Sequence, residues 1–345
     1  MPVSPSLESR IARVPKATPL LELKAVSKAF VIRQSGLRKH WLAVQAVNNV
    51  SLSLQRGETV GLVGESGCGK STLARVCALL YQPDSGEVLL AGKAVNGLPQ
   101  KKLREFRRRV QLVFQDPFAA LNPRLPISAI LTEPLTINRI GNPRQRREQA
   151  AEILTAVGMN TDILNRYPHE FSGGQRQRIA IARALMLEPE LIIADESVSA
   201  LDVSVQSQIL NLLADIKAKR GLAYLFIGHD LAVVEHLADR VAVMYLGRIV
   251  EFAPRDELFV VPAHPYTRAL IAAIPAIQIG GKRRFGTPIG DVPSPLNPPP
   301  GCPYHTRCPK AQALCVQERP ELAVTPGRPA LHQVACHFPE SAPSC

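Results

Sequence analysis

The sequence Gly64-Glu65-Ser66-Gly67-Cys68-Gly69-Lys70-Ser71 decides the fold of this chain. It follows the apolar run Val60–Val63 and leads into Thr72–Leu80, whose apolar residues recur with a helical period. A strand, a glycine-rich turn and a helix form the context in which G-x-x-x-x-G-K-[ST] cradles phosphates. We therefore predict a nucleotide triphosphate site at residues 64–72.

Each residue type in this stretch has a role in phosphate binding. Glycines adopt backbone angles closed to other residues, so that successive N–H groups can point into one concavity. The helix that follows presents its positive dipole end to the phosphate oxygens. Lys70 adds a full charge near the β- and γ-phosphates, and the Ser71 hydroxyl can ligate Mg²⁺.

The composition of the chain is that of a globular protein. The 345 residues are 46% hydrophobic and 20% charged, which predicts one large domain and a smaller one, or two modest ones. The longest apolar stretch, Ala269–Gly281, contains Pro275 and is too short to span a membrane. The first residues, 1–20, lack a signal-peptide pattern and are interpreted as a disordered leader, which predicts a cytosolic protein.

The formal net charge of +12 has three interpretations that the sequence leaves open. Basic residues concentrate at Lys101–Arg109 and Arg144–Arg147. They could bind nucleic acid, contact an anionic membrane face, or lie on solvated helix faces.

Short alternating runs precede the phosphate loop and predict an antiparallel sheet. They are Leu21–Val26, Ala43–Val47 and Val50–Leu54, and Gly86–Gly92 is expected to add an edge strand. Buried strands are predicted at Val110–Gln115, Leu191–Ala194, Tyr224–Ile227 and Val241–Tyr245. Because helical patterns alternate with these strands, we expect an α/β core with a parallel sheet.

The remaining segments differ in character. Residues 121–187 are predicted to be helical, with breaks at Pro123, Pro126, Pro134 and Pro143. From Pro254 onward the chain becomes rich in proline, which indicates a linker into a compact tail.

Two acids end the apolar run at residues 191–194. Asp195 is placed to hold Mg²⁺, directly or through water. Glu196 follows, where a carboxylate could orient and deprotonate the water that attacks the γ-phosphate.

A second glycine motif, Phe171-Ser172-Gly173-Gly174-Gln175-Arg176-Gln177-Arg178, precedes a clear helix. Ser172 is a natural N-cap, and the two glycines allow the backbone to approach an anion closely. Together with the phosphate loop, this motif resembles the signature sequence of ATP-binding cassette (ABC) ATPases. The family usually has leucine where this chain has Phe171, at a position that packs and does not touch nucleotide.

The resemblance implies roles for further residues, with ATP and Mg²⁺ as cofactors. Phe30 resembles the aromatic residue that stacks on adenine, and Gln115 resembles the Q-loop glutamine that approaches the metal. Ser199-Ala200-Leu201-Asp202 matches the D-loop, and His229 is similar to the switch histidine at the γ-phosphate. The implied catalytic residues are thus Lys70, Gln115, Glu196 and His229, and the implied Mg²⁺ ligands are Ser71, Gln115 and Asp195.

In this family two nucleotide domains meet head to tail. The resemblance implies that Ser172–Gln175 and Asp202 complete the partner's ATP site. It also implies a fold with an ABC-type core at residues 21–260, whose helical subdomain covers about 118–190, and a small extension at 261–345.

Three segments carry a closer resemblance, to the ATPase subunits of oligopeptide and dipeptide importers. They are Ala263–Leu270, Asp291–Pro295 and Gly301–Pro309, while Asp195–Ser199 resembles the second ATPase of such importers. The implied partners are a non-identical ATPase, two transmembrane permease subunits and an extracytoplasmic solute-binding protein, with no nucleic acid. The implied location is the cytoplasmic face of a bacterial inner membrane.

Four cysteines lie in the tail, at Cys302, Cys308, Cys315 and Cys336. Their spacing lacks the paired C-x-x-C knuckles of zinc ribbons, although His305 and His337 keep zinc open as an alternative. Four thiolates on irregular loops also suit an iron–sulfur cube, and the family's extension is associated with a [4Fe–4S] cluster. A tail without metal is the third possibility.

The function expected is ATP hydrolysis that powers import of di- or oligopeptides, or of a related small solute. The rival hypothesis is a soluble ABC ATPase that acts on nucleic acid or ribosomes. Such proteins usually carry two cassettes or long coiled-coil insertions, which this chain lacks.

Overall fold

The computed structural model describes residues 18–34, 40–114, 116, 120–197, 201–273, 290–324, 328 and 330–340. The strands are β1 (Leu21–Gln34), β2 (His40–Leu54), β3 (Thr59–Val63), β4 (Ser85–Leu90), β5 (Lys93–Ala94), β6 (Val110–Val113), β7 (Leu191–Asp195), β8 (Ala223–Ile227), β9 (Arg240–Tyr245), β10 (Arg248–Pro254), β11 (Ala323–Val324) and β12 (Gln333–Val334). The α-helices are α1 (Lys70–Cys77), α2 (Gln100–Arg109), α4 (Ile127–Ile137), α5 (Pro143–Ala156), α6 (Gly173–Leu185), α7 (Val203–Arg220), α8 (Leu231–Leu237), α9 (Arg255–Val260), α10 (Pro265–Ala272) and α11 (Ala313–Gln317). Short 3₁₀ turns are η2 (Thr161–Asn165), η3 (Pro168–Glu170) and η4 (His305–Arg307).

The described strands form two sheets, as the alternating patterns predict. The larger sheet has the order β11-β12-β10-β9-β3-β8-β7-β6, and its part from β9 to β6 is parallel. The smaller sheet has the order β2-β1-β4-β5 and is antiparallel. The mixed α/β architecture with an antiparallel sheet and a helical part is therefore confirmed.

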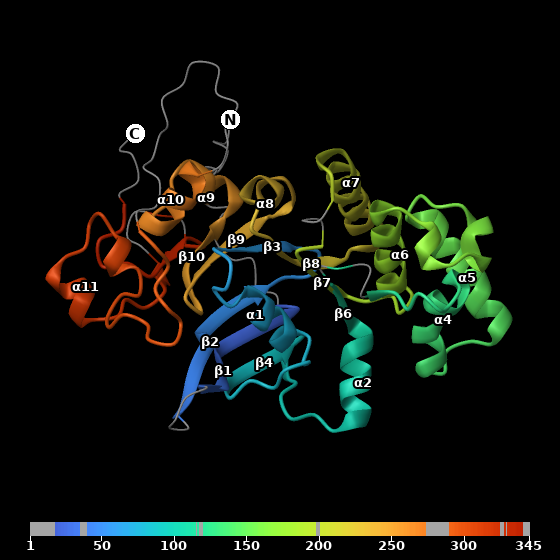
Figure 1. The fold of residues 1–345 in the computed structure, drawn as a ribbon, viewed down its shortest axis with the longest axis horizontal. Helices are drawn as coiled ribbons and strands as arrows, with labels where there is room; N and C mark the ends of the chain where they lie inside the picture. The colour runs from blue at the N-terminus through green and yellow to red at the C-terminus, as the bar shows by residue number, and fades with distance from the viewer. Residues whose placement is uncertain are drawn as a thin grey trace, which may run out of the picture.

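Alternation of side chains along the central strands creates two cores. On β8, Tyr224 and Phe226 face one core, whereas Leu225 and Ile227 face the other. The first core lies under α4 to α8, and the second lies under α1 and the antiparallel sheet (Figure 1). Because the central strands are covered on both faces, their residues are predominantly apolar.

The antiparallel sheet is more continuous than the sequence predicts. The runs Ala43–Val47 and Val50–Leu54 belong to one strand, β2, which pairs with β1 through irregular register shifts. The expectation of an edge strand at Gly86–Gly92 was wrong, because β4 lies between β1 and the two-residue strand β5. β5 is too short for its alternation to be visible in the sequence.

The helical segment corrects a further expectation. Pro126 precedes α4 and Pro143 begins α5, as proline at a helix start should, but Pro134 lies inside α4. The expected break at Pro134 was wrong because α4 buries Ile130 and Leu135 in the first core on either side of the proline. Burying such side chains contributes about 1.5–3 kcal/mol each, which offsets the cost of a helical proline, about 3 kcal/mol.

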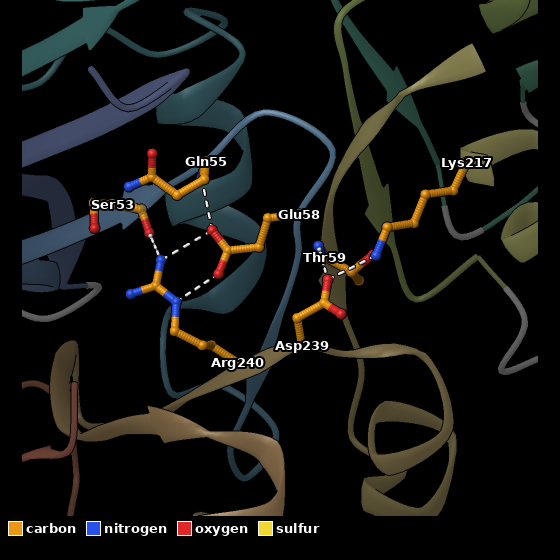
Figure 2. Close-up of polar contacts among 7 residues, drawn as sticks. All are labelled: Ser53, Gln55, Glu58, Thr59, Lys217, Asp239 and Arg240. Carbon is orange, nitrogen blue, oxygen red and sulfur yellow. Dashed lines mark hydrogen bonds and ion pairs between the residues drawn. The ribbon is translucent and has the colours of Figure 1, made fainter. Parts of the chain in front are cut away.

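Polar contacts fix the start of β3, the strand that leads to the phosphate loop (Figure 2). Asp239 Oδ2 accepts from Thr59 N at 2.7 Å and from Lys217 Nζ at 2.6 Å. The neighbouring Arg240 donates to both carboxylate oxygens of Glu58 and to Ser53 O. These contacts join the start of β9 to β2, β3 and α7 at the end of the sheet remote from the phosphate loop.

The tail joins the larger sheet through a buried carboxylate on β10. Glu251 accepts from Ala263 N at 2.7 Å and from His264 N at 2.9 Å, and His332 Nε2 lies 2.7 Å from its Oε1. His264 caps α10 by accepting from Tyr266 N, and burial lowers the His264 pKa to about 4, which keeps the imidazole neutral as that role requires. Across the described ranges, no helix has the length and apolarity needed to cross a membrane.

Candidate functional site

The phosphate loop connects β3 to α1 and holds its lysine in place. Lys70 is the first residue of α1 and is 4% exposed. Its Nζ donates to Gly64 O at 2.7 Å and to Glu65 O at 3.0 Å. A buried ammonium group with carbonyl partners on one loop is placed to meet an incoming phosphate.

Two glycines of the loop occupy positions that no other residue could fill without a shift. A Cβ on Gly64 would lie 2.2 Å from Met244 O, and a Cβ on Gly69 would lie 2.0 Å from Ala46 O. Gly69 also has φ 108°, which disfavours residues with a side chain. The loop is therefore packed tightly between β2 and β9.

A pocket of about 320 Å³ opens at this loop. Among its lining residues are Ser66, Gly67, Cys68, Gly69, Lys70, Ser71, Thr72 and Glu196, all expected from the sequence. It also contains Val44, Gln45, Ala46, Leu246, Gly247 and Pro295, which sequence reasoning missed. Gly247 N donates to Cys68 O at 2.8 Å, so the β9–β10 turn supports the loop. In the sequence, only the glycine at position 247 indicated a turn there.

Two of the three oxygen ligands expected for Mg²⁺, Ser71 and Asp195, lie together. Ser71 Oγ donates to Asp195 Oδ1 at 3.0 Å, which joins the start of α1 to the end of β7. Burial raises the pKa of the Asp195 carboxyl, and the Ser71 hydrogen bond opposes that rise. A hydroxyl beside a partly desolvated carboxylate is a donor set that suits Mg²⁺, since this ion prefers oxygen ligands and favours the charged carboxylate.

Glu196 and His229 approach one another at the carboxyl ends of neighbouring strands. His229 Nδ1 lies 3.6 Å from Glu196 Oε2, and Glu196 N donates to Ile227 O at 2.9 Å. Glu196 has φ 45°, in the left-handed region that costs a residue with a side chain about 1–3 kcal/mol. With this backbone, Glu196 is one of the residues that line the phosphate pocket.

The second glycine motif begins α6 as predicted. Ser172 Oγ accepts from Gln175 N, and Gln175 Oε1 accepts from Ser172 N, which completes a capping box. Gly174 packs against α7, where a Cβ would lie 2.4 Å from Val205 Cγ1. Phe171 is buried under the guanidinium of Arg166, so this position packs as the resemblance implies.

Several predicted residues are not brought to the pocket by the structure. Phe30 packs edge-on against Tyr81, with ring centroids 5.3 Å apart, and it is Val44, its partner on β2, that lines the pocket. Asp202 lies at the start of α7. Gln115 and Ser199 lie outside the described residues, so their roles stay predictions.

The four tail cysteines surround one small pocket with His305 and His337. Burial raises the thiol pKa of Cys302 and Cys308, and raises that of Cys336 to about 12. In the part of the chain that the structure describes, no three His, Cys, Asp or Glu side chains are arranged to hold a metal ion. The thiols nevertheless have the chemistry of soft-metal ligands, and all four line the same pocket.

A larger groove, of about 720 Å³, lies apart from the phosphate pocket. It is lined by α2, β6, α4 and α6, and includes Leu80, Phe114 and Ile137 as exposed apolar side chains. Lys101, Arg104, Arg107 and Arg108 border it from α2. An apolar floor with a basic rim is typical of a protein-binding surface.

Comparison with known proteins agrees with this geometry. Residues 47–199 match the family model described as "ABC transporter", and residues 250–315 match "Oligopeptide/dipeptide transporter, C-terminal region". The chain is 50% identical to the oligopeptide transport ATP-binding protein AppF of Bacillus subtilis, over 92% of this chain and 97% of that protein. It is also 50% identical to the di/tripeptide transport ATP-binding protein DppF of Pseudomonas aeruginosa, over 88% of this chain and 93% of that protein.

The fold also matches a solved structure. A dimeric ATP-binding cassette in a post-hydrolysis state, bound to ADP and phosphate, superposes with a TM-score of 0.60 and 31% sequence identity. The match covers 68% of this chain and 98% of that one. Since the phosphate loop, the paired acids, the capped glycine motif and the carboxyl-terminal region all agree, the chain belongs to the ABC transporter family, among the ATP-binding proteins of oligopeptide and dipeptide transporters.

Proposed function

We propose that this protein hydrolyses ATP to power the import of di- or oligopeptides, or of a related small solute. The observation that carries the proposal is the convergence of Lys70, Ser71 and Glu196 on one pocket. The peptide transport ATP-binding relatives support the solute class. The experiment is transport of labelled peptides into vesicles that carry the whole transporter: ATP-dependent uptake is expected, and ATPase activity stimulated only by nucleic acid would favour the rival function.

In the proposed mechanism, each residue of the site has one role in ATP hydrolysis. Lys70 and the loop N–H groups would bind the phosphates, and Ser71 and Asp195 would hold Mg²⁺, which would neutralise phosphate charge. Glu196 takes the proton of the attacking water, and His229 stays close enough to orient that carboxylate. Gln115, which follows β6 in the sequence, is proposed to approach the metal.

The proposed assembly is a head-to-tail pair with a second, non-identical ATPase. Ser172–Gln175 and Asp202 would then close on the partner's nucleotide, and Phe30 would stack on adenine. The dimeric cassette that this fold matches supports the pairing. Two permease subunits and an extracytoplasmic solute-binding protein would complete the transporter at the cytoplasmic face of a bacterial inner membrane.

We assign the groove between α2 and α4 to the permease subunits. In the family, short coupling helices dock near the Q-loop and the helical segment, and this groove lies there. Its apolar floor would receive the apolar face of such a helix, and the basic rim would contact acidic residues or lipid headgroups beside it. This contact would account for the net charge of +12 without a nucleic-acid partner.

Changing Ile137 to Asp should weaken assembly with the permease at least tenfold. Ile137 ends α4, lines the groove and is 57% exposed, so a carboxylate there would be buried on docking at a cost of several kcal/mol. Co-purification measures the effect. Val260→Asp, at a 62% exposed apolar residue on α9 outside the groove, is the matched control. Equal assembly by the two variants would remove the groove from permease docking.

We further propose that Cys302, Cys308, Cys315 and Cys336 bind a [4Fe–4S] cluster, supported by their common pocket and the resemblance of the tail. Anaerobically purified protein should contain about four irons per chain, as expected for a cube held by four thiolates. Iron should be lost in Cys302→Ser and retained in Cys77→Ser, whose buried cysteine lies on α1. Bound zinc, or no metal at all, would contradict the assignment.

A further inference from the structure

The tail of the chain reaches the phosphate loop directly. Glu65 N donates to Tyr266 Oη at 2.9 Å, and Arg307 donates from Nη1 and Nη2 to the two carboxylate oxygens of Glu65, at 2.8 and 3.0 Å. Tyr266 belongs to α10, and Arg307 ends η4 beside Cys308. Both the backbone and the side chain of one loop residue are thus held from the carboxyl-terminal region.

Arg307 is held rigidly at this contact. Its side chain is 5% exposed, and its guanidinium lies 5.9 Å from the ring centroid of Tyr245 and 5.8 Å from that of Tyr304. The rings of Tyr245, Tyr266 and Tyr304 pack together, with centroids 4.6–5.3 Å apart. The Glu65 carboxylate raises the pKa of Arg307, so the guanidinium stays charged. A bidentate pair in such a setting loses little conformational entropy when it forms.

Glu65 in turn positions the lysine that meets the phosphates. Its carbonyl oxygen accepts from Lys70 Nζ at 3.0 Å, beside Gly64 O at 2.7 Å. A shift of Glu65 would therefore move the Lys70 ammonium and rotate the loop N–H groups. The expected loss is therefore in ATP affinity, since the displaced groups are the ones that bind the phosphates.

We propose that Arg307 and Tyr266 are positioning residues for ATP, through which the carboxyl-terminal region holds the phosphate loop in its receiving geometry. The inference rests on the proposed ATPase function and adds a second role to this region. Neither residue lines the phosphate pocket, so both act through Glu65. The segment that carries the cysteines thereby becomes part of the ATP site.

The test uses the full chain and compares ATP binding and steady-state ATPase kinetics. Arg307→Gln should raise the KM and Kd for ATP about tenfold and change kcat less than twofold, since Glu196 and His229 are untouched. Arg307→Lys should fall between wild type and Arg307→Gln, because an ammonium group cannot reproduce the bidentate contact. Tyr266→Phe, which removes only the acceptor for Glu65 N, should raise the KM about threefold.

Arg268→Gln is the matched control for a purely structural role. Arg268 lies on α10 and pairs with Glu340 at 2.7 Å, within the carboxyl-terminal region. It should lower thermal stability without changing the KM for ATP. If Arg307→Gln also changes only stability, or the two variants raise the KM equally, the inference is overturned.

A double-mutant cycle separates the contact from general damage. Glu65→Gln combined with Arg307→Gln should raise the KM no more than Arg307→Gln alone, because both changes break one pair. Multiplicative effects would contradict coupling through Glu65. The two proposals fail differently: a wild-type chain that neither binds nor hydrolyses ATP removes the proposed function, whereas normal ATPase activity with an unchanged KM in Arg307→Gln removes this inference alone.

Discussion

Replacing Glu196 with Gln should lower kcat for ATP hydrolysis about 10²- to 10³-fold and leave ATP binding intact. The amide keeps the volume of the side chain and can still hydrogen-bond toward His229, 3.6 Å from the carboxylate in the structure. It loses only the ability to accept a proton, and general base catalysis contributes about 10²–10⁴-fold. Single-turnover hydrolysis and equilibrium ATP binding measure the two effects separately.

The Kd for ATP should be unchanged or lower in this variant. Lys70 and Ser71 keep their contacts, and loss of a negative charge beside the phosphates reduces repulsion. Glu188→Gln is the matched control, because Glu188 is exposed and has the same unusual backbone, with φ 50° against 45° at Glu196. Near-normal turnover by Glu196→Gln would assign the base to another residue.

The site residues that could be predicted from the sequence lie in short motifs at or directly after the ends of strands. Lys70 and Ser71 follow β3 after one glycine-rich turn, and Asp195 and Glu196 end or follow β7. Since the carboxyl ends of parallel strands meet at one edge of a sheet, two local motifs were enough to predict one pocket. The strands of the antiparallel sheet could be predicted as well, because their alternation of apolar and polar residues is also a local pattern.

The parts that the sequence does not predict come from distant contacts. Arg307 and Tyr266 are 242 and 201 residues from Glu65 in the chain, and no local pattern marks them as neighbours of a phosphate loop. The β9–β10 turn supports the loop through backbone groups, and because every residue type has these groups, the sequence does not mark the contact. Pro134 shows the same limit in the fold, because buried contacts of α4 outweigh a local helix breaker.

Replacing Lys70 with Met should weaken ATP binding at least about 100-fold and abolish turnover at millimolar ATP. The thioether side chain fills the buried volume of the lysine stem but supplies no charge to the β- and γ-phosphates. Loss of one preorganised donor to a developing anion typically costs about 10²–10³-fold in rate, and here the same donor also binds the ground state. Isothermal titration with ATP and steady-state hydrolysis measure the two losses.

The fold should survive this change, which makes the result informative. Lys70 is 4% exposed and donates to Gly64 O and Glu65 O, so replacing it removes a buried ion at the cost of two hydrogen bonds. We expect the thermal midpoint to move by only a few degrees, about what a change of 1 kcal/mol produces. Lys93→Met, at an exposed lysine of β5, controls for loss of surface charge. Wild-type ATP affinity in Lys70→Met would mean that the loop N–H groups and the α1 dipole alone bind the phosphates. The contacts of Lys70 with the loop carbonyls would then be purely structural.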